Sequence, residues 1–131
     1  MKPIAAAFAL FALALPGTSL ACSCIQNLDV PQAVDKSTRV FRGTVTAIER
    51  HDGLLERVTF QVSEHFKGAP AAVVHVENHA SGPMCGYPFQ EGIEYVVYAR
   101  GEERQLQTSS CSRTVVAVDP GSELDALRAA R

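Results

Sequence analysis

The chain has 131 residues, of which 47% are hydrophobic, and its formal net charge is −2. A chain of this length forms one small domain rather than several. The mild negative charge argues against a nucleic-acid-binding protein, which would present a strongly basic face to its partner.

Residues 1–21 have the three parts of a secretory signal peptide. Lys2 supplies a positive charge, residues 4–15 form an apolar run, and a Pro-Gly pair and small residues follow, ending at Ala21. This pattern predicts cleavage after Ala21, so that the exported domain spans residues 22–131 and the protein is secreted or periplasmic. A lipoprotein signal is the alternative, in which Cys22 would carry the lipid. The exported domain contains no run long enough to span a bilayer, so we expect no membrane contact unless Cys22 is lipidated.

All of the cysteines fall in the predicted exported domain: Cys22, Cys24, Cys85 and Cys111. An even number of cysteines in an oxidising compartment predicts disulfides, here two. A four-thiolate zinc site is the alternative, but such sites usually contain paired cysteine motifs. Cys22 and Cys24 are too close in sequence to bridge easily, so each is expected to pair with one distant cysteine. The sequence leaves both of these crossed pairings open.

The first half of the domain predicts a short helix followed by a long hairpin. Asp29 is suited to cap a short helix with Pro31 in its first turn. Residues 38–50 and 54–66 then alternate between polar and apolar side chains, and a His-Asp-Gly turn joins the two runs. Gly43 interrupts the first run, which predicts a bulge or a sharp bend. The two runs together predict a strongly twisted hairpin.

Three shorter strands are predicted after the hairpin. They cover residues 72–76, 93–99 and 104–108, and a polar loop over residues 78–83 follows the first of them. Five strands in a small exported domain indicate a mainly β fold, and we predict an OB-like closed barrel with short flanking helices. A β-sandwich is the alternative, because the number of strands alone does not separate the two.

A second helix is predicted over residues 122–131. Asp119 would be its N-cap and Pro120 would occupy its first position, a favourable start. Leu124 and Leu127 would face inward.

The side chains that could support catalysis or bind a metal have simpler explanations. His75 and His79 are four residues apart, as in a helical metal pair, but in the predicted β region four residues span about 13 Å. Ser109 and Ser110 lack a nucleophile-elbow pattern and an evident base. We therefore predict that the protein is not an enzyme. Among the other candidates, His51 lies at a turn tip and His65 among polar strand positions, and neither has an identifiable partner. Glu102 and Glu103 are expected to form a solvated turn, and four aromatic residues are expected to pack in the barrel (Tyr87, Phe89, Tyr95, Tyr98).

The segment Cys22-Ser23-Cys24, directly after the predicted signal peptide, resembles the start of the tissue inhibitors of metalloproteinases. The similarity covers residues 22 to about 114 and corresponds to the N-terminal, netrin-like domain of these inhibitors, in a single-domain form of bacterial type. The further motifs are VFRGTV (40–45), VTFQV (58–62), FKG (66–68), Cys85-Gly86, residues 92–99 and TSSC (108–111).

The resemblance implies a netrin-like barrel of the OB type with the disulfides Cys22–Cys85 and Cys24–Cys111. It also implies inhibition of a metalloendopeptidase. The α-amine and carbonyl oxygen of Cys22 would chelate the catalytic zinc of the partner protease, and Ser23 would enter its main specificity pocket. The protease-binding segment would consist of Cys22, Ser23, Cys24 and Ile25.

This resemblance also bears on cofactors and partners. The inhibitor would need no cofactor of its own, would meet zinc only in its partner, and would act as a monomer. The alternative function is that of a netrin-like envelope or extracellular interaction module without inhibitory activity, in which the same disulfides are only structural.

Overall fold

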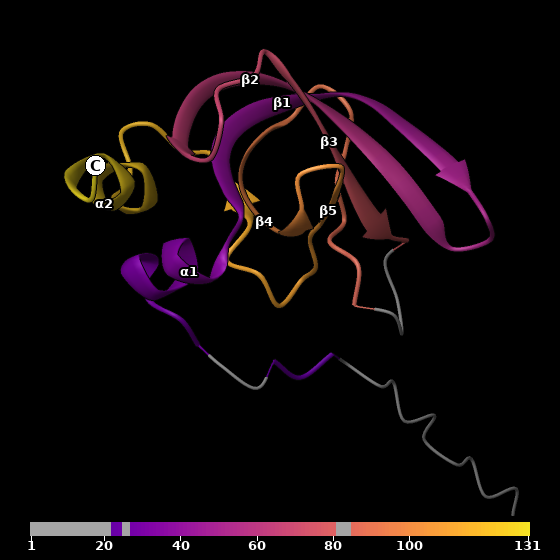
Figure 1. The fold of residues 1–131 in the computed structure, drawn as a ribbon, viewed down its shortest axis with the longest axis horizontal. Helices are drawn as coiled ribbons and strands as arrows, with labels where there is room; N and C mark the ends of the chain where they lie inside the picture. Colours follow the sequence, from indigo (N-terminus) through magenta and orange to yellow (C-terminus); the bar gives the residue numbers. More distant parts are fainter. Residues whose placement is uncertain (1–21, 25–26, 81–84) are drawn as a thin grey trace, which may run out of the picture.

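The computed structural model of the chain describes residues 22–24, 27–80 and 85–131 (Figure 1). The predicted signal peptide, Ile25 and part of the predicted polar loop lie outside the described residues. Within the described residues, no helix is both long enough and apolar enough to cross a membrane.

Five strands close into a barrel (Figure 1). The strands β1 (Arg39–His51), β2 (Leu55–Lys67), β3 (Val73–His79), β4 (Glu94–Glu102) and β5 (Gln105–Gln107) are joined in the order β1-β2-β3-β5-β4, and β4 also pairs with β1. All neighbours in this barrel are antiparallel except β3 and β5, which run parallel. This confirms the predicted mainly β fold, an OB-like barrel with short flanking helices. The β-sandwich alternative is wrong, because a single sheet closes on itself.

The predicted hairpin is formed by β1 and β2, each of 13 residues. Gly43 lies at an irregularity in their pairing, as the predicted bulge requires. A Cβ atom on Gly43 would come within 3.0 Å of the carbonyl oxygen of Gln61, so the two backbones approach closely there. At the tip, Asp52 and Gly53 adopt positive φ angles of 47° and 74°, as tight hairpin turns require.

The hydrophobic core has two parts, one on each side of the barrel wall. Phe41 belongs to the cluster inside the barrel, whereas its neighbour Val40 belongs to the cluster beneath the helices. Val97 and Val96 divide in the same way. Because successive side chains of a strand point to opposite faces, β1 and β4 are buried on both faces where the helices cover them. The inner cluster also contains Val45, Val58, Phe60, Val74, Val76, Phe89, Tyr95, Ala99 and Leu106, and the outer cluster Val30, Ala33, Tyr98, Leu124 and Leu127.

Helix α1 (Val30–Lys36) begins where the sequence predicts. The Asp29 carboxylate accepts a hydrogen bond from the backbone N–H of Gln32 at 2.9 Å. In return, the Gln32 side chain accepts one from the backbone N–H of Asp29 at 3.1 Å. This capping box satisfies two backbone donors at the start of the helix.

Helix α2 (Ser122–Ala129) packs against the outer wall of the barrel. Leu124 and Leu127 are buried, as predicted. The predicted start of the helix is wrong, because Gly121 rather than Asp119 is the N-cap residue.

Ion pairs explain why Asp119 does not cap α2. The peptide bond between Asp119 and Pro120 is cis, and the Asp119 carboxylate accepts hydrogen bonds from Arg42 at 3.1 Å and from Arg128 at 3.0 Å. Arg128 also donates to the second oxygen of this carboxylate at 3.1 Å, so guanidinium groups engage both oxygens. Arg128 also donates to Glu64 at 2.9 Å, so the network joins β1, β2 and α2.

Two strands differ from the prediction. β3 continues to His79, which pairs with Leu55, although the sequence predicts a strand end at residue 76 and a polar loop from residue 78. The polar residues at the end of β3 therefore belong to the sheet and not to a loop. Asn78 among them is buried, with 1% of its surface exposed. A short strand that the sequence analysis missed, β6 (Val115–Val116), pairs with β4.

Tyr98 is the exception among the aromatic residues predicted to pack in the barrel. Phe89 and Tyr95 are buried inside it and the partly buried Tyr87 packs against them, with ring centroids between 4.7 and 5.6 Å apart. Tyr98 instead lies in the outer cluster, where its hydroxyl donates a hydrogen bond to Glu123 at 2.6 Å. Its position in β4, one residue after the inward-facing Val97, places it on the outer face.

Candidate functional site

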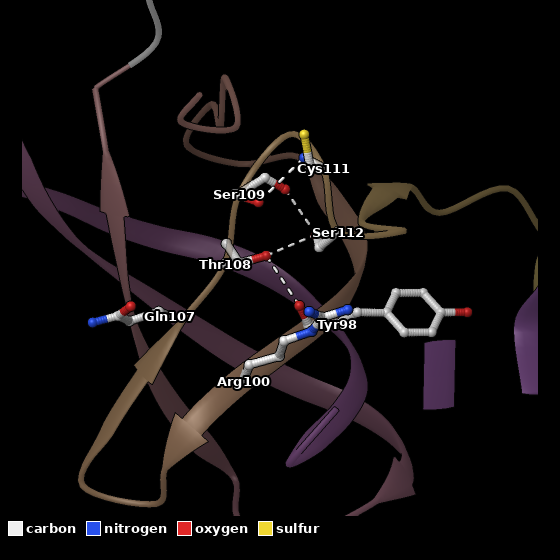
Figure 2. Close-up of a pocket in the computed structure, with 7 residues that line it drawn as sticks. All are labelled: Tyr98, Arg100, Gln107, Thr108, Ser109, Cys111 and Ser112. Carbon is white, nitrogen blue, oxygen red and sulfur yellow. Dashed lines mark hydrogen bonds between the residues drawn. The ribbon is translucent and has the colours of Figure 1, made fainter. Parts of the chain in front are cut away.

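A group of hydroxyls fixes the loop that contains Cys111 against β4 (Figure 2). The Thr108 hydroxyl donates to the carbonyl oxygen of Tyr98 at 3.0 Å, and the Tyr98 N–H donates to the Thr114 hydroxyl oxygen at 3.1 Å. The Ser112 hydroxyl lies 3.0 Å from that of Thr108 and 2.7 Å from that of Thr114. Thr108 and Thr114 are buried, so these bonds do not compete with water and the loop has a defined place on the barrel wall.

The segment that contains Cys85 is held against both this loop and the end of β3. The backbone N–H and the hydroxyl of Ser110 donate to the carbonyl oxygen of Cys85, at 2.8 and 3.1 Å. Gly86 packs directly on the backbone of β3, because a Cβ atom there would overlap the carbonyl oxygen of His79. The loops around Cys85 and Cys111 thus form one connected platform.

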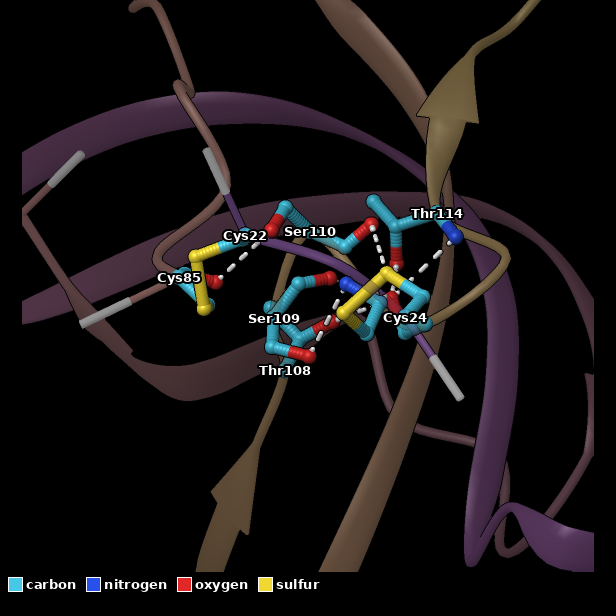
Figure 3. Close-up of a disulfide and its surroundings, with 9 residues drawn as sticks. Cys22, Cys24, Cys85, Thr108, Ser109, Ser110 and Thr114 are labelled. Carbon is cyan, nitrogen blue, oxygen red and sulfur yellow. Dashed lines mark hydrogen bonds between the residues drawn. A yellow bond between two sulfur atoms is a disulfide. The ribbon is translucent and has the colours of Figure 1, made fainter. Parts of the chain in front are cut away.

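Two disulfides fasten residues 22–24 to this platform (Figure 3). Cys22 is bonded to Cys85 and Cys24 to Cys111, with Cα–Cα distances of 5.6 and 5.2 Å. This is the pairing that the resemblance implies, and it decides between the two pairings that the sequence leaves open. All four thiols are consumed, which excludes the four-thiolate zinc site. We call residues 22–24 the N-terminal ridge.

The N-terminal ridge is held at both ends and open in the middle. Cys22 is half-buried, whereas Ser23 and Cys24 are exposed. A segment this short and exposed buries too little apolar surface to offset the entropy lost when its backbone is fixed. The disulfides supply that constraint, so the ridge is ordered before any partner binds and the entropic cost of binding is reduced.

Two hollows border the Cys24–Cys111 disulfide. One has a volume of about 200 Å³ and is lined by Tyr98, Arg100, Gln107, Thr108, Ser109, Cys111 and Ser112 (Figure 2). The other has a volume of about 210 Å³ and is lined by Cys24, Asn27, Leu28, Ser110, Cys111, Ser112 and Arg113. A protein that covers the ridge would therefore meet a hollowed surface beside this disulfide.

Arg113 ties the chain just beyond the ridge to the start of α2. Its guanidinium donates two hydrogen bonds of 2.8 Å to the Glu123 carboxylate and one of 2.9 Å to the carbonyl oxygen of Leu28. The hydrogen bond with Glu123 raises the pKa of Arg113. Burial, and then the hydrogen bond to Glu123, raises the pKa of Tyr98 far above its ordinary value. Tyr98 therefore remains a neutral hydrogen-bond donor, which is a structural role.

The histidines do not assemble a metal site in the described part of the chain, where no three His, Cys, Asp or Glu side chains are placed to bind an ion. His75 is exposed, with its Nδ1 3.0 Å from the Thr59 hydroxyl. The prediction that His65 has no partner is wrong, since its Nε2 lies 2.9 Å from both the backbone nitrogen and the carbonyl oxygen of Ala71. This partner is a backbone group close in sequence, which side-chain patterns do not indicate.

The buried polar side chains that hold the platform were not predicted from the sequence. Asn78 exchanges two hydrogen bonds with the backbone of Tyr87, at 2.8 and 2.9 Å. The signal was the alternation of Val74, Val76 and Asn78, which places all three on one face of a strand. The hydroxyl-rich run at residues 108–114 was a second signal, because hydroxyls can bind nearby backbone groups.

Of the predicted protease-binding residues, Cys22, Ser23 and Cys24 lie together in the ridge, while Ile25 is outside the described residues. No protein-family model matches the chain, and no curated protein matches it either. Membership of the family that the N-terminal motif resembles is therefore a proposal, supported by the motif and by the geometry of the ridge.

Proposed function

We propose that this protein is an inhibitor of zinc metalloproteinases that acts through the N-terminus of Cys22. The observation that carries the proposal is the exposed Ser23 between two half-cystines, each bonded to a different loop of the barrel. A protease cleft accepts a narrow, exposed stretch of chain, and the ridge offers one that is already ordered. The resemblance to the tissue inhibitors of metalloproteinases supports the same function.

The chemistry of an N-terminal cysteine suits the open position of a catalytic zinc. Such a zinc has three protein ligands and a water molecule in the fourth position. After cleavage behind Ala21, the amine nitrogen and the carbonyl oxygen of Cys22 together can replace that water. An α-amine has an ordinary pKa of about 7.7–8.0, so loss of its proton beside Zn²⁺ costs little at neutral pH. The Cys22 side chain is used in the disulfide and takes no part in this chelation.

Ser23 is the residue that we propose enters the specificity pocket of the protease. Its side chain is small and fills little of a deep pocket, so we expect the protein to inhibit several metalloproteinases rather than one. Cys24 and Ile25 would continue the contact along the cleft.

The proposal requires export and cleavage. Two disulfides are typical of secreted or periplasmic proteins. Removal of residues 1–21 would expose the amine of Cys22, whereas a lipid on that residue would block it. The mass of the exported protein tests this requirement, because correct cleavage leaves residues 22–131 unmodified except for the two disulfides.

Inhibition assays with the exported protein test the function. We expect inhibition of members of a panel of zinc metalloproteinases and no effect on serine proteases, which have no zinc. Ser23→Gly should change the order of preference within the panel, because it alters the pocket contact and leaves the chelating atoms in place. If no metalloproteinase is inhibited, the proposal fails and the remaining function is that of a netrin-like interaction module.

A further inference from the structure

We propose that Asn78 is a positioning residue for the N-terminal ridge. Its buried side chain sets the place of Cys85 and, through the disulfide, the place of Cys22. The consequence for inhibition rests on the proposed function, whereas the positioning itself does not.

The Asn78 side-chain amide binds the backbone of the segment that follows Cys85. Its Nδ2 donates to the carbonyl oxygen of Tyr87 at 2.8 Å, and its Oδ1 accepts from the N–H of Tyr87 at 2.9 Å. Only 1% of the surface of Asn78 is exposed, so water cannot readily substitute for a lost bond. Buried polar groups left without partners are costly, which makes this pair of bonds a firm attachment.

The attached segment needs such support because its backbone is constrained. Cys85 has a φ of 60°, a left-handed conformation that is uncommon for residues other than glycine. The next residue, Gly86, packs on the carbonyl oxygen of His79 with no space for a side chain. A backbone in this conformation persists only where its surroundings hold it, and Asn78 holds it at Tyr87.

The two ends of the ridge consequently have different attachments to the barrel, and the hydrogen bonds from Ser110 to the Cys85 carbonyl oxygen join the two. Cys22 is linked through Cys85 and Tyr87 to Asn78, which is paired in register with Glu56 of β2. Cys24 is linked through Cys111 to the hydroxyls of residues 108–114 and so to β4. Loss of one attachment should therefore affect one disulfide much more than the other.

Asn78→Ala tests this separation in the full-length exported protein. In glutathione buffers, two glutathione thiols reduce one protein disulfide to two thiols and form one oxidised glutathione. Alkylation and mass spectrometry then count each reduced pair. We expect the equilibrium constant for forming Cys22–Cys85 to fall about tenfold. A change of this size corresponds to the net contribution of two hydrogen bonds to stability. The constant for Cys24–Cys111 should change less than about twofold.

Two further variants keep the test decisive. Gly86→Ala displaces the same segment and leaves Asn78 in place, so it should weaken Cys22–Cys85 selectively even if Asn78→Ala does not fold. Leu124→Ala is the matched control, because it destabilises the outer cluster on the other side of the barrel wall. Under conditions where Leu124→Ala is folded, the equilibrium constants for forming both disulfides should lie within about twofold of the wild-type values.

The outcomes separate the positioning role from the proposed function. Equal changes in both disulfides, or no change with Asn78→Ala and Gly86→Ala, would overturn the role of Asn78. A selective change in a protein that inhibits no metalloproteinase would uphold that role and reject the proposed function. Where the wild type inhibits, Asn78→Ala should raise the inhibition constant about tenfold through faster dissociation, and an unchanged constant would overturn the link to inhibition.

Discussion

The helix-covered wall of the barrel and the N-terminal ridge are held in place by different forces. At the wall, Leu124 and Leu127 are buried against β1 and β4, and ion pairs around Arg128 join α2 to the strands. At the ridge, Ser23 is exposed and its two neighbours are held by disulfides. Because Ser23 is exposed, apolar burial contributes little to the order of the ridge, and the disulfides supply the constraint.

Because of this difference, changes in the wall and changes in the ridge should have different effects on binding. A change in the wall should lower the free energy of unfolding and leave the ridge intact in the folded protein. A change at the ridge should alter binding while the barrel keeps its structure.

The largest expected effect comes from removing the Cys24–Cys111 disulfide with Cys24→Ser and Cys111→Ser together. The bridge spans 87 residues, and the loop-entropy relation gives a loss of about 4.6 kcal/mol in the free energy of unfolding. The circular dichroism spectrum should stay that of the wild type, because neither cysteine belongs to the inner or outer cluster. Urea unfolding measures the loss, and an unchanged free energy would contradict the constraint assigned to this bridge.

A loss of the same order or smaller is expected for Leu124→Ala, which leaves a cavity beneath α2. The Leu124 side chain is fully buried, and such a substitution costs about 2–5 kcal/mol. Thermal or urea unfolding measures this cost. Inhibition by the folded variant should equal that of the wild type, and a loss of inhibition well below the unfolding transition would show that wall and ridge are coupled.

The smallest effect concerns acid stability. The hydrogen bond from Arg128 lowers the pKa of Glu64 below its ordinary value of 4.5, and Arg128 and Arg42 lower the pKa of Asp119. A carboxyl group whose pKa is lower in the folded state stabilises above its unfolded pKa, and this contribution is lost as the pH falls through the folded pKa. Glu64→Gln should remove about 1 kcal/mol or less at pH 7, since the pair is partly open to solvent.

The matching measurement is urea unfolding at pH 7 and at pH 3. Glu64→Gln should narrow the difference in stability between the two pH values relative to the wild type. A variant with the same difference as the wild type would show that this ion pair does not contribute to acid sensitivity.

Local patterns in the sequence predict the elements that depend on neighbouring residues. The alternation in residues 38–50 and 54–66 predicts the hairpin of β1 and β2, and Asp29 predicts the start of α1. The start of α2 is not predictable in this way, because the carboxylate of Asp119 is bound by Arg42, 77 residues earlier in the chain. Pairings between distant charges depend on the closed barrel and leave no local signal.

The candidate site, like the fold, was predictable from the sequence only in part. The short interval between Cys22 and Cys24 predicts two bonds to distant cysteines, but spacing does not choose the pairing, because the two partner loops meet only in the folded barrel. The alternation of Val74, Val76 and Asn78 indicates the strand face on which Asn78 lies, but its hydrogen bonds to Tyr87 leave no local signal in the sequence.

The most direct test of zinc chelation is to add one alanine before Cys22. The extension keeps both disulfides and both clusters, so we expect an unchanged melting temperature. It moves the amine away from its proposed place on the zinc and puts a peptide bond there. We expect the extended protein to lose inhibition of every metalloproteinase that the correctly cleaved protein inhibits. Equal inhibition by the two forms would contradict chelation by Cys22.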